Sequence, residues 1–319
     1  MQALTTPMTA DDGTTVVVHS WLPDGVAPLG GPEAGGAMPR GVIQVAHGMA
    51  EHAGRYERFA AAAVEAGYAV HADDHRGHGL TIAAPADRGF LADKDGWSEV
   101  VGDLATLLRL EQRTYPGVPV VLLGHSWGSF LARDLATRQG ADLAALVLTG
   151  TGGNPGAAGR VGYALASAEC RLKGPRHPSV ALDQLVFGSY NRGFHPQRTA
   201  FDWLSRDEAE VDRYLADPLC GFTCTAGFFR DLIAGTFLVS SPRRFRRTPQ
   251  DLPVHLYSGA MDPVGAQGRG VRQVATQYRR AGVREVGMTL YPGARHEVLN
   301  ETNREQVTVD ILAWIGAHT

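Results

Sequence analysis

The sequence predicts an α/β protein in which a mostly parallel sheet is flanked by helices and interrupted by one inserted helical segment. Short apolar runs alternate with longer stretches of helical periodicity up to about residue 150. The alternation then stops for about one hundred residues and returns near residue 254. We therefore expect residues 1–150 to form the first part of a core, residues 151–250 an inserted helical cap, and residues 251–319 the second part of the core.

The first 150 residues supply most of the predicted sheet. Apolar, β-rich runs predict strands at 14–22, 41–47, 68–72, 120–123 and 143–148. Helical periodicity predicts helices at 56–66, 97–115 and 129–138. Because strands and helices alternate here, we expect neighbouring strands to run parallel.

A connection at residues 24–40 interrupts this early pattern. It contains five glycines and three prolines, which predicts a flexible surface segment without chemistry of its own. Further along, residues 151–250 lack a strand run of comparable quality, and residues 201–219 mix aromatic with charged side chains. Two more strands are expected at 254–258 and 286–291, followed by a last helix at 303–315.

Composition excludes several classes of protein. The chain has 319 residues, 44% hydrophobic and 20% charged, and a net charge of −3, so it offers no large basic field for nucleic acid. Three cysteines, Cys170, Cys220 and Cys224, are too few for a disulfide framework. The start of the chain has neither a basic segment nor an apolar one, and no eighteen apolar residues run together. We expect a cytoplasmic protein without a membrane span.

The most specific motif is the G-x-S-x-G run at residues 124–128, which joins a predicted strand to a predicted helix. Glycines on both sides allow a sharp turn that projects the Ser126 hydroxyl above the sheet. A hydroxyl at such a turn is the typical nucleophile of an acyl-transfer enzyme. We therefore predict that Ser126 is a catalytic nucleophile.

A serine hydroxyl needs a base to remove its proton, and in proteins with this turn the chain order is serine, acid, histidine. Asp262 and His296 follow the two late predicted strands, at the sheet edge where active sites of open α/β sheets lie. His296 is therefore the predicted base and Asp262 the acid that orients it. Glu297 is the nearest rival acid, but a neighbour on a tight loop seldom turns back to the base.

An oxyanion requires donors that are fixed before the reaction. The amide after the nucleophile, Trp127 N–H, is the first predicted donor. The second is expected from the loop after an early strand, where Met49 follows His47 and Gly48. We therefore predict an oxyanion hole made by the Met49 and Trp127 amides.

Other polar clusters allow alternative interpretations. His47, Glu51 and His52, and the polar run at 71–78, contain metal-ligand residue types, but their spacing does not match a known zinc pattern. We expect no metal and no organic cofactor, and we interpret residues 71–78 as a hydrogen-bonded support for the site floor. A run of arginines surrounds Phe245, at positions Arg243, Arg244, Arg246 and Arg247. It indicates either a solvated face or a contact for an anionic head group.

The predicted cap carries apolar residues at helical spacing, namely Phe228, Phe229, Leu232, Ile233, Thr236 and Phe237. Such a stripe is typical of a packed core, and it is equally expected of the wall of an acyl pocket under a cap. Both interpretations stay open on the sequence.

With these motifs together, the chain resembles the monoacylglycerol lipase and lysophospholipase branch of the α/β hydrolases, also grouped as serine aminopeptidase-like hydrolases. The resemblance rests on H-G-x-x-E-H at 47–52, R-Y at 55–56, D-x-R-G-H-G at 74–79 and the turn at 124–128. It implies the α/β-hydrolase fold, with an eight-stranded sheet and a cap over an apolar channel. It also implies an oxyanion hole at Met49 and Trp127.

The activity that this resemblance implies is hydrolysis of a single-chain ester such as a monoacylglycerol or lysophospholipid. The expected partner is a small-molecule ester with an apolar acyl chain, with transient lipid contact through the cap and no nucleic acid. Amide hydrolysis or acyl transfer at the same serine is the alternative, although residues 47–51 depart from the H-G-G-P-G of proline iminopeptidases. A non-catalytic ligand-binding protein is a further alternative, because fold alone does not fix function. The oligomeric state is not indicated.

Overall fold

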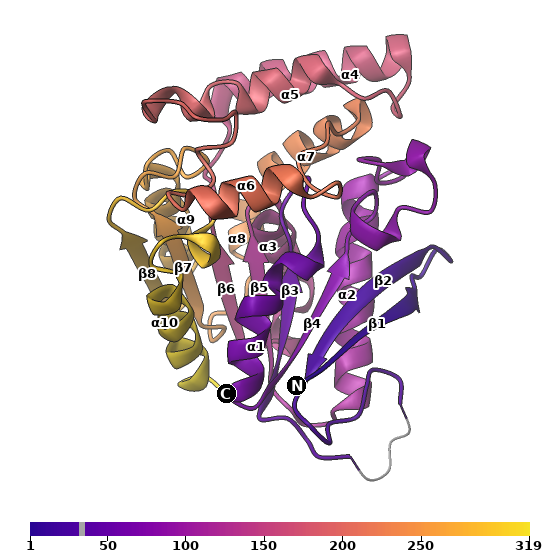
Figure 1. The fold of residues 1–319 in the computed structure, drawn as a ribbon, viewed down its shortest axis with the longest axis vertical. Helices are drawn as coiled ribbons and strands as arrows, with labels where there is room; N and C mark the ends of the chain where they lie inside the picture. Colours follow the sequence, from indigo (N-terminus) through magenta and orange to yellow (C-terminus); the bar gives the residue numbers. More distant parts are fainter. Residues whose placement is uncertain (32–35) are drawn as a thin grey trace.

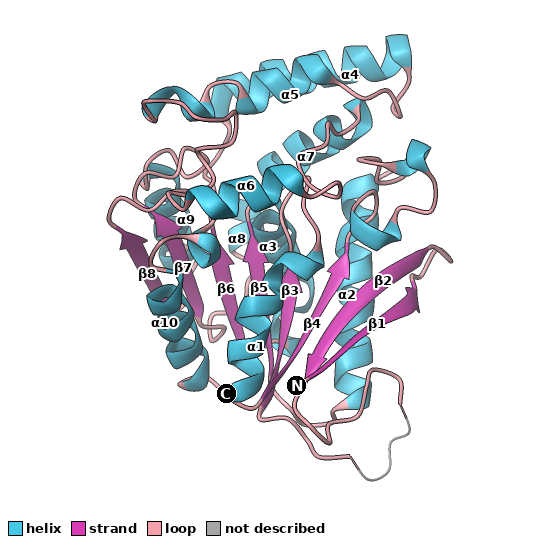
Figure 2. Cartoon of the chain, in the orientation of Figure 1, coloured by secondary structure: helices cyan, strands magenta, loops and turns pink. Residues whose placement is uncertain are grey.

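In a computed structural model that describes residues 1–31 and 36–319, the chain forms one eight-stranded sheet with helices on both faces (Figures 1 and 2). The strands lie in the order β1-β2-β4-β3-β5-β6-β7-β8. Their bounds are β1 (Gln2–Thr9), β2 (Thr15–Leu22), β3 (Gly41–Ala46), β4 (Tyr68–Asp74), β5 (Val120–His125), β6 (Ala145–Thr149), β7 (Val254–Gly259) and β8 (Val286–Tyr291). The predicted α/β class is confirmed.

The sheet is parallel except at one edge. Strands β3 to β8 pair in parallel, whereas β1 pairs antiparallel with β2, and β2 pairs antiparallel with β4. The sequence gives no indication of β1, because this edge strand is mostly exposed and rich in threonine. The other seven strands coincide with the predicted ones to within a few residues.

The two faces of the sheet bury separate apolar clusters. Helices α1 (Glu57–Glu65) and α10 (Arg304–Gly316) cover one face, and α2 (Gly96–Thr114), α3 (Trp127–Gln139) and α9 (Arg269–Arg280) cover the other. Within β5, Leu122 enters the cluster of α2 and α3, while Val121 and Leu123 enter that of α1 and α10. This alternation follows from the two-residue repeat of a strand, so a continuous apolar run is expected where both faces are buried.

Five helices lie between β6 and β7 in the chain. They are α4 (Gly156–Lys173), α5 (Val180–Phe187), α6 (Glu208–Ala216), α7 (Ala226–Val239) and α8 (Pro242–Phe245). Four of them, α4 to α7, lie above the carboxyl ends of the strands, and α8 packs beside α3 and α9 (Figure 1). Helix α7 approaches α2 so closely that a Cβ on Gly235 would lie 2.1 Å from the Trp97 ring. We call these five helices the inserted helices; their division from the core at residues 151 and 250 stays a prediction.

Short 3₁₀ turns complete the described elements. They are η1 (Ala53–Tyr56), η2 (Gly79–Thr81), η3 (Pro85–Asp87), η4 (Gly140–Asp142), η5 (Tyr190–Gly193) and η6 (Val298–Asn300). In the connection predicted at 24–40, residues 32–35 lie outside the described residues, but Val26 is buried and Tyr115 donates a hydrogen bond to Ala27 O at 2.6 Å. Part of this connection is therefore packed against the core. Within the described ranges, no helix has both the length and the apolar content needed to cross a bilayer.

Helix α2, which covers one face of the sheet, carries a buried acid, Glu111. Glu111 is fully buried, and neither of its carboxyl oxygens has a hydrogen-bond partner among the described residues. Burial, with a smaller effect of the Asp73 charge, raises the pKa of Glu111 well above its ordinary value. Folding therefore favours the protonated form of this side chain.

We predict that Glu111→Gln stabilises the protein at alkaline pH. A carboxyl whose folded pKa is raised contributes stability at low pH, and this contribution is lost as the pH rises from about 4.3, its unfolded value. The variant should therefore gain at least about 1.4 kcal/mol in free energy of unfolding at pH 8, the free energy that corresponds to a difference of one in pKa between the folded and unfolded states. Its advantage should vanish near pH 4. Denaturant titrations at both pH values, with exposed Glu65→Gln as control, would measure this; equal stability of the variants at pH 8 would contradict it.

Candidate active site

Ser126 lies at the turn between β5 and α3, with φ 50° and ψ −120°. A positive φ is rare for a residue with a side chain, and it is held here by the bond from Ser126 N–H to Thr149 O at 2.9 Å. The side chain is half-buried and lines a cavity under the inserted helices. The turn thus places the Ser126 side chain at this cavity.

The two glycines of the motif are required because there is no room for a side chain. A Cβ on Gly128 would lie 2.1 Å from Ala46 O, at the end of the neighbouring strand β3. A Cβ on Gly124 would lie 2.6 Å from Gly128 O. Helix α3 can therefore start directly against β3 only when both positions are glycine.

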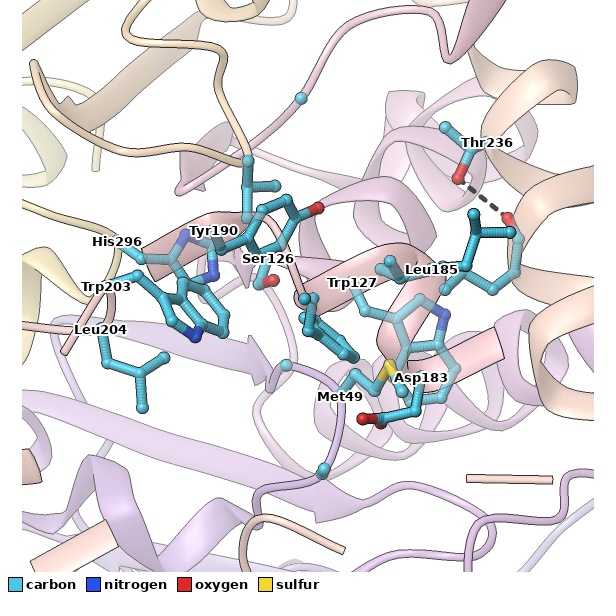
Figure 3. A pocket seen from close by; sticks show the side chains of 18 of the residues that line it. Met49, Ser126, Trp127, Asp183, Leu185, Tyr190, Trp203, Leu204, Thr236 and His296 are labelled. Atoms are coloured by element: carbon cyan, nitrogen blue, oxygen red, sulfur yellow. Dashed lines mark hydrogen bonds between the residues drawn. The ribbon is translucent and has the colours of Figure 1, made fainter. Parts of the chain in front are cut away.

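Asp262 and His296 meet beyond the ends of β7 and β8. The His296 Nδ1 and Asp262 Oδ1 atoms are 3.0 Å apart, and both residues are buried. Asp262 Oδ1 also accepts the Val264 N–H at 2.9 Å, which fixes the carboxylate. Within the described residues Ser126 Oγ forms no hydrogen bond to His296, but both residues line the same cavity (Figure 3). Hydrogen bonds of this kind often tighten only when substrate binds.

The environment of His296 favours its protonated form. Burial lowers the pKa of His296, but the charge and the hydrogen bond of Asp262 outweigh burial, and Glu297 and Glu51 add to them. The net pKa is therefore raised above its ordinary value. Because Asp262 accepts from Nδ1, the Nε2 atom is left to exchange a proton on the cavity side.

The peptide between Gly48 and Met49 is held by His47. The carbonyl of Gly48 can only accept, so His47 Nδ1 donates to it at 2.7 Å, while His47 Nε2 accepts the His75 N–H at 3.0 Å. This fixes one neutral tautomer, and burial lowers the pKa of His47 well below its ordinary value. In a trans peptide the following N–H points opposite to the carbonyl, so Met49 N–H points away from His47. Met49 itself lines the cavity.

Trp127 is the first residue of α3, so its N–H has no acceptor within the helix. Its side chain is buried, with the ring centroids of Trp127 and Phe228 4.8 Å apart. The structure thus brings Met49 and Trp127 to the cavity that contains Ser126 and His296 (Figure 3).

A buried ion pair network ties the loop of Met49 to the loop of His296. Glu51 Oε1 accepts the Gly48 N–H at 2.5 Å, and Glu51 Oε2 accepts from Arg55 at 2.6 Å. Arg55 also binds both carboxylate oxygens of Glu297, at 2.6 and 2.7 Å. Burial would raise the pKa of Glu297, but the charge and hydrogen bonds of Arg55 hold it at about 2. Glu297 therefore faces Arg55 and not His296.

The cavity has a volume of about 1030 Å³, within the size range of small-molecule sites. Of the residues predicted on α7, Leu232 and Ile233 line it. Phe228, Phe229 and Phe237 do not, because the first two are fully buried in the core and α7 turns only one side to the cavity. The residues at 232, 233 and 236 share that side.

Several wall residues could not be identified from the sequence. Trp203, Leu204 and Tyr190 line the cavity from the segment between α5 and α6, and the Trp203 ring lies 5.0 Å from that of His296. His296 N–H also donates to Trp203 O at 3.3 Å. The only signal was the mixture of aromatic and charged residues at 201–219, which has no clear periodicity.

The polar residues grouped above as alternative metal sites do not point toward one common position. His47 binds Gly48 and His75, Glu51 binds Gly48 and Arg55, and His52 binds Asp217 instead. In the run at 71–78, Asp73 binds His75, and Asp74 accepts the Ala53 N–H. The bond between Ala53 and Asp74 links β4 to the loop after β3.

The arginine run around Phe245 lies on α8 and just after it. Arg244 forms an ion pair with the buried Asp134 of α3 at 2.8 Å, and Phe245 is buried. At least one of the four arginines is therefore structural and not part of a solvated face.

Comparisons with known proteins agree with this architecture. Residues 37–303 match the family described as Hydrolase_4, serine aminopeptidase S33. The chain is 32% identical to a monoacylglycerol lipase of Mycolicibacterium smegmatis, covering 96% of this chain and 94% of the relative. It is 28% identical to a human monoglyceride lipase over a match that covers 97% of this chain and 89% of the relative. A thermostable carboxyl esterase from Bacillus coagulans, solved in complex with glycerol, superposes with a TM-score of 0.89 at 28% identity. The superposition covers 100% of this chain and 99% of the esterase.

We predict that Arg55→Met destabilises the fold strongly. The substitution leaves Glu51 and Glu297 buried and facing each other without a counter-charge, which typically costs about 3–5 kcal/mol. Arg58→Met is the matched control, because Arg58 is far more exposed and its ion pair with Glu210 should contribute less than about 1 kcal/mol. Urea unfolding of both variants provides the measurement. Equal losses in the two variants would show that the network contributes no more than a surface pair.

Proposed function

Because the chain belongs to the Hydrolase_4, serine aminopeptidase S33, family, we propose that it hydrolyses a single-chain carboxylic ester through an acyl-enzyme. It is an esterase- or lipase-type hydrolase, as its relatives' names indicate. The observation that carries the detailed proposal is His296, which is held by Asp262 on one side and opens on the other to the cavity of Ser126. The proposed roles are nucleophile for Ser126, base for His296 and orienting acid for Asp262.

In the proposed mechanism, His296 Nε2 takes the proton of Ser126 Oγ while this oxygen attacks the ester carbonyl. The Met49 and Trp127 amides bind the negative oxygen of the tetrahedral intermediate. The C–O bond to the alcohol then breaks, and the alcohol leaves with the proton from His296. Water, deprotonated by His296, attacks the acyl-enzyme and releases the carboxylic acid, and Ser126 recovers its proton.

The proposed substrate is an ester with one apolar acyl chain, such as a monoacylglycerol or lysophospholipid. Leu232, Ile233, Phe187 and Phe222 give the cavity an apolar wall, which suits an acyl chain. The named activity of the bacterial and human relatives supports the same class. Amide hydrolysis or acyl transfer would use the same three residues and is separated by the products formed with amides or added glycerol. A non-catalytic ligand-binding role would give none of these products.

Transient contact with lipid is a further part of the proposal. Helix α4 forms part of the outermost layer above the cavity (Figure 1) and exposes 59% of Val161, 50% of Leu165 and 84% of Leu172. Exposed apolar side chains in the outer layer above such a cavity favour interfacial binding. A cytoplasmic location is also proposed, supported by three free cysteines.

The decisive test compares the wild-type protein with Ser126→Ala on p-nitrophenyl esters from acetate to palmitate and on monoacylglycerols. The expected result is serine-dependent release of nitrophenol or fatty acid, with a preference among chain lengths that reflects the cavity. Thr151→Ala, which removes a hydroxyl near the end of β6, is the matched control. Activity that survives in Ser126→Ala, or none on any ester, would overturn the ester proposal; serine-dependent cleavage of amides alone would favour the peptidase alternative.

The pH dependence tests the base and its acid. Since His296 must be neutral to accept a proton and its pKa is raised, kcat/KM should fall as the pH drops, with a midpoint above about 6.5. Asp262→Asn should lower turnover by a factor on the order of 10⁴ and move the midpoint to lower pH, because it removes the main charge that raises this pKa. Asp310→Asn, which makes the same charge change at a remote site, should do neither. A wild-type midpoint below 6.5, or an Asp262→Asn profile like the wild type, would argue against these roles.

A further inference from the structure

We propose that His52, Asp217 and Cys220 form a binding site for Zn²⁺ that fastens the loop after β3 to the inserted helices. An imidazole nitrogen, a carboxylate oxygen and a thiol sulfur of these residues lie within 4.8 Å of one another. Nitrogen, oxygen and sulfur ligands in this combination are typical of Zn²⁺. The site is separate from the proposed catalytic residues, and it does not depend on the proposed ester hydrolysis.

The local backbone already brings two of the ligands together. Cys220 N–H donates to Asp217 O at 3.0 Å, which closes a turn over residues 217–220. Ligands separated by two residues on a turn are the usual arrangement of zinc-binding loops. The third ligand comes from far along the chain, where His52 Nε2 lies 2.9 Å from Asp217 Oδ2.

The distances require only a small adjustment for the ion. Two ligands bonded to tetrahedral Zn²⁺ at about 2.0–2.3 Å are about 3.3–3.8 Å apart. The His52–Asp217 contact would therefore open slightly, and no separation in the group would need to close by more than about 1 Å. As the ion binds, the proton that His52 Nε2 donates to Asp217 passes to Nδ1, which leaves Nε2 free to ligate. The proton of the Cys220 thiol is released to solvent as the Zn–S bond forms, and water completes the coordination.

Neighbouring groups already orient the ligands. Asp217 Oδ1 accepts the Leu219 N–H at 2.8 Å, which leaves Oδ2 for the ion. The His52 ring lies over Gly54, where an added Cβ would come within 2.9 Å of its Cε1 atom. The side chains of His52 and Asp217 are 15% and 30% exposed, so an ion can reach them from solvent.

Charged groups surround the proposed site. Burial raises the pKa of the Cys220 thiol, so Zn²⁺ must displace the thiol proton to bind. The carboxylates of Glu51, Asp217 and Glu297 and the guanidinium of Arg55 all act on this thiol. Asp217, as a ligand, brings one negative charge directly to the ion.

The ion would reinforce contacts that already join the two segments. Ala50, two residues before His52, accepts hydrogen bonds from Gly221 N–H at 2.9 Å and from the Tyr214 hydroxyl at 3.0 Å. A bond from Zn²⁺ to each segment would therefore restrict the loop that carries Met49. Because the unfolded chain cannot hold these ligands together, binding should also stabilise the fold.

The test uses the full-length protein after removal of metal by a chelator and its exchange into chelator-free buffer. ZnCl₂ is titrated by calorimetry, and CoCl₂ by absorption, since a cobalt–thiolate bond gives a near-ultraviolet charge-transfer band. The wild type should bind one Zn²⁺, gain thermal stability and develop the band. Cys220→Ser should lose the band and bind Zn²⁺ at least about tenfold more weakly. Cys170→Ser, which removes a thiol on α4, should behave like the wild type.

Because Cys220 is buried, its substitution can disturb folding, and the two partly exposed ligands provide independent variants. His52→Gln and Asp217→Asn should each weaken Zn²⁺ binding at least about tenfold while the circular dichroism spectrum is unchanged. The proposal is overturned if the wild type binds no Zn²⁺ in stoichiometric amount. It is also overturned if binding survives in both of these variants, or if the charge-transfer band persists in folded Cys220→Ser.

Discussion

The close contact between the start of α3 and the end of β3 is the constraint on which the site depends. Gly128 lies so near Ala46 O that any side chain would collide with the strand. Since α3 begins against β3, the turn at Ser126 and the loop that follows β3 must share one small region. The nucleophile and Met49 therefore come together as a consequence of sheet packing, before any side chain is oriented.

Neighbouring charges then determine the protonation states of the side chains in this region. Burial by itself would keep His296 neutral, and Asp262 reverses this preference. The same competition occurs at Glu297, where Arg55 prevails over burial. Because Arg55 binds Glu297 on one side and Glu51 on the other, the two loops at the cavity are held by one cation. The two neighbouring residues His296 and Glu297 thus have different environments and different protonation preferences.

The sequence predicted those parts of the protein that follow from local rules. Buried strands are continuous apolar runs, and Ser126 and Asp262 each follow such a run. His296 follows the half-buried edge strand β8, so the meeting of the three residues at one edge of the sheet could be expected. Strand β1 could not, because an exposed edge strand has little apolar pattern. The wall residues Trp203 and Tyr190 were also missed, since they lie on irregular segments whose placement depends on tertiary contacts. On α7, periodicity identified the helix but not which residues face the cavity.

Side-chain pairs between residues far apart in the chain are the feature that a single sequence predicts least. Arg55 and Glu297 are separated by 242 positions, and His52 and Asp217 by 165, so neither pair leaves a local pattern. Both pairs connect the loop after β3 to segments that arrive late in the chain. Strand ends of the core thus supply the polar atoms at the base of the cavity, while the inserted helices and their connections supply much of its wall. A change in the inserted helices can therefore alter which molecule fits without moving Ser126 or His296, but a change at the loop after β3 affects both.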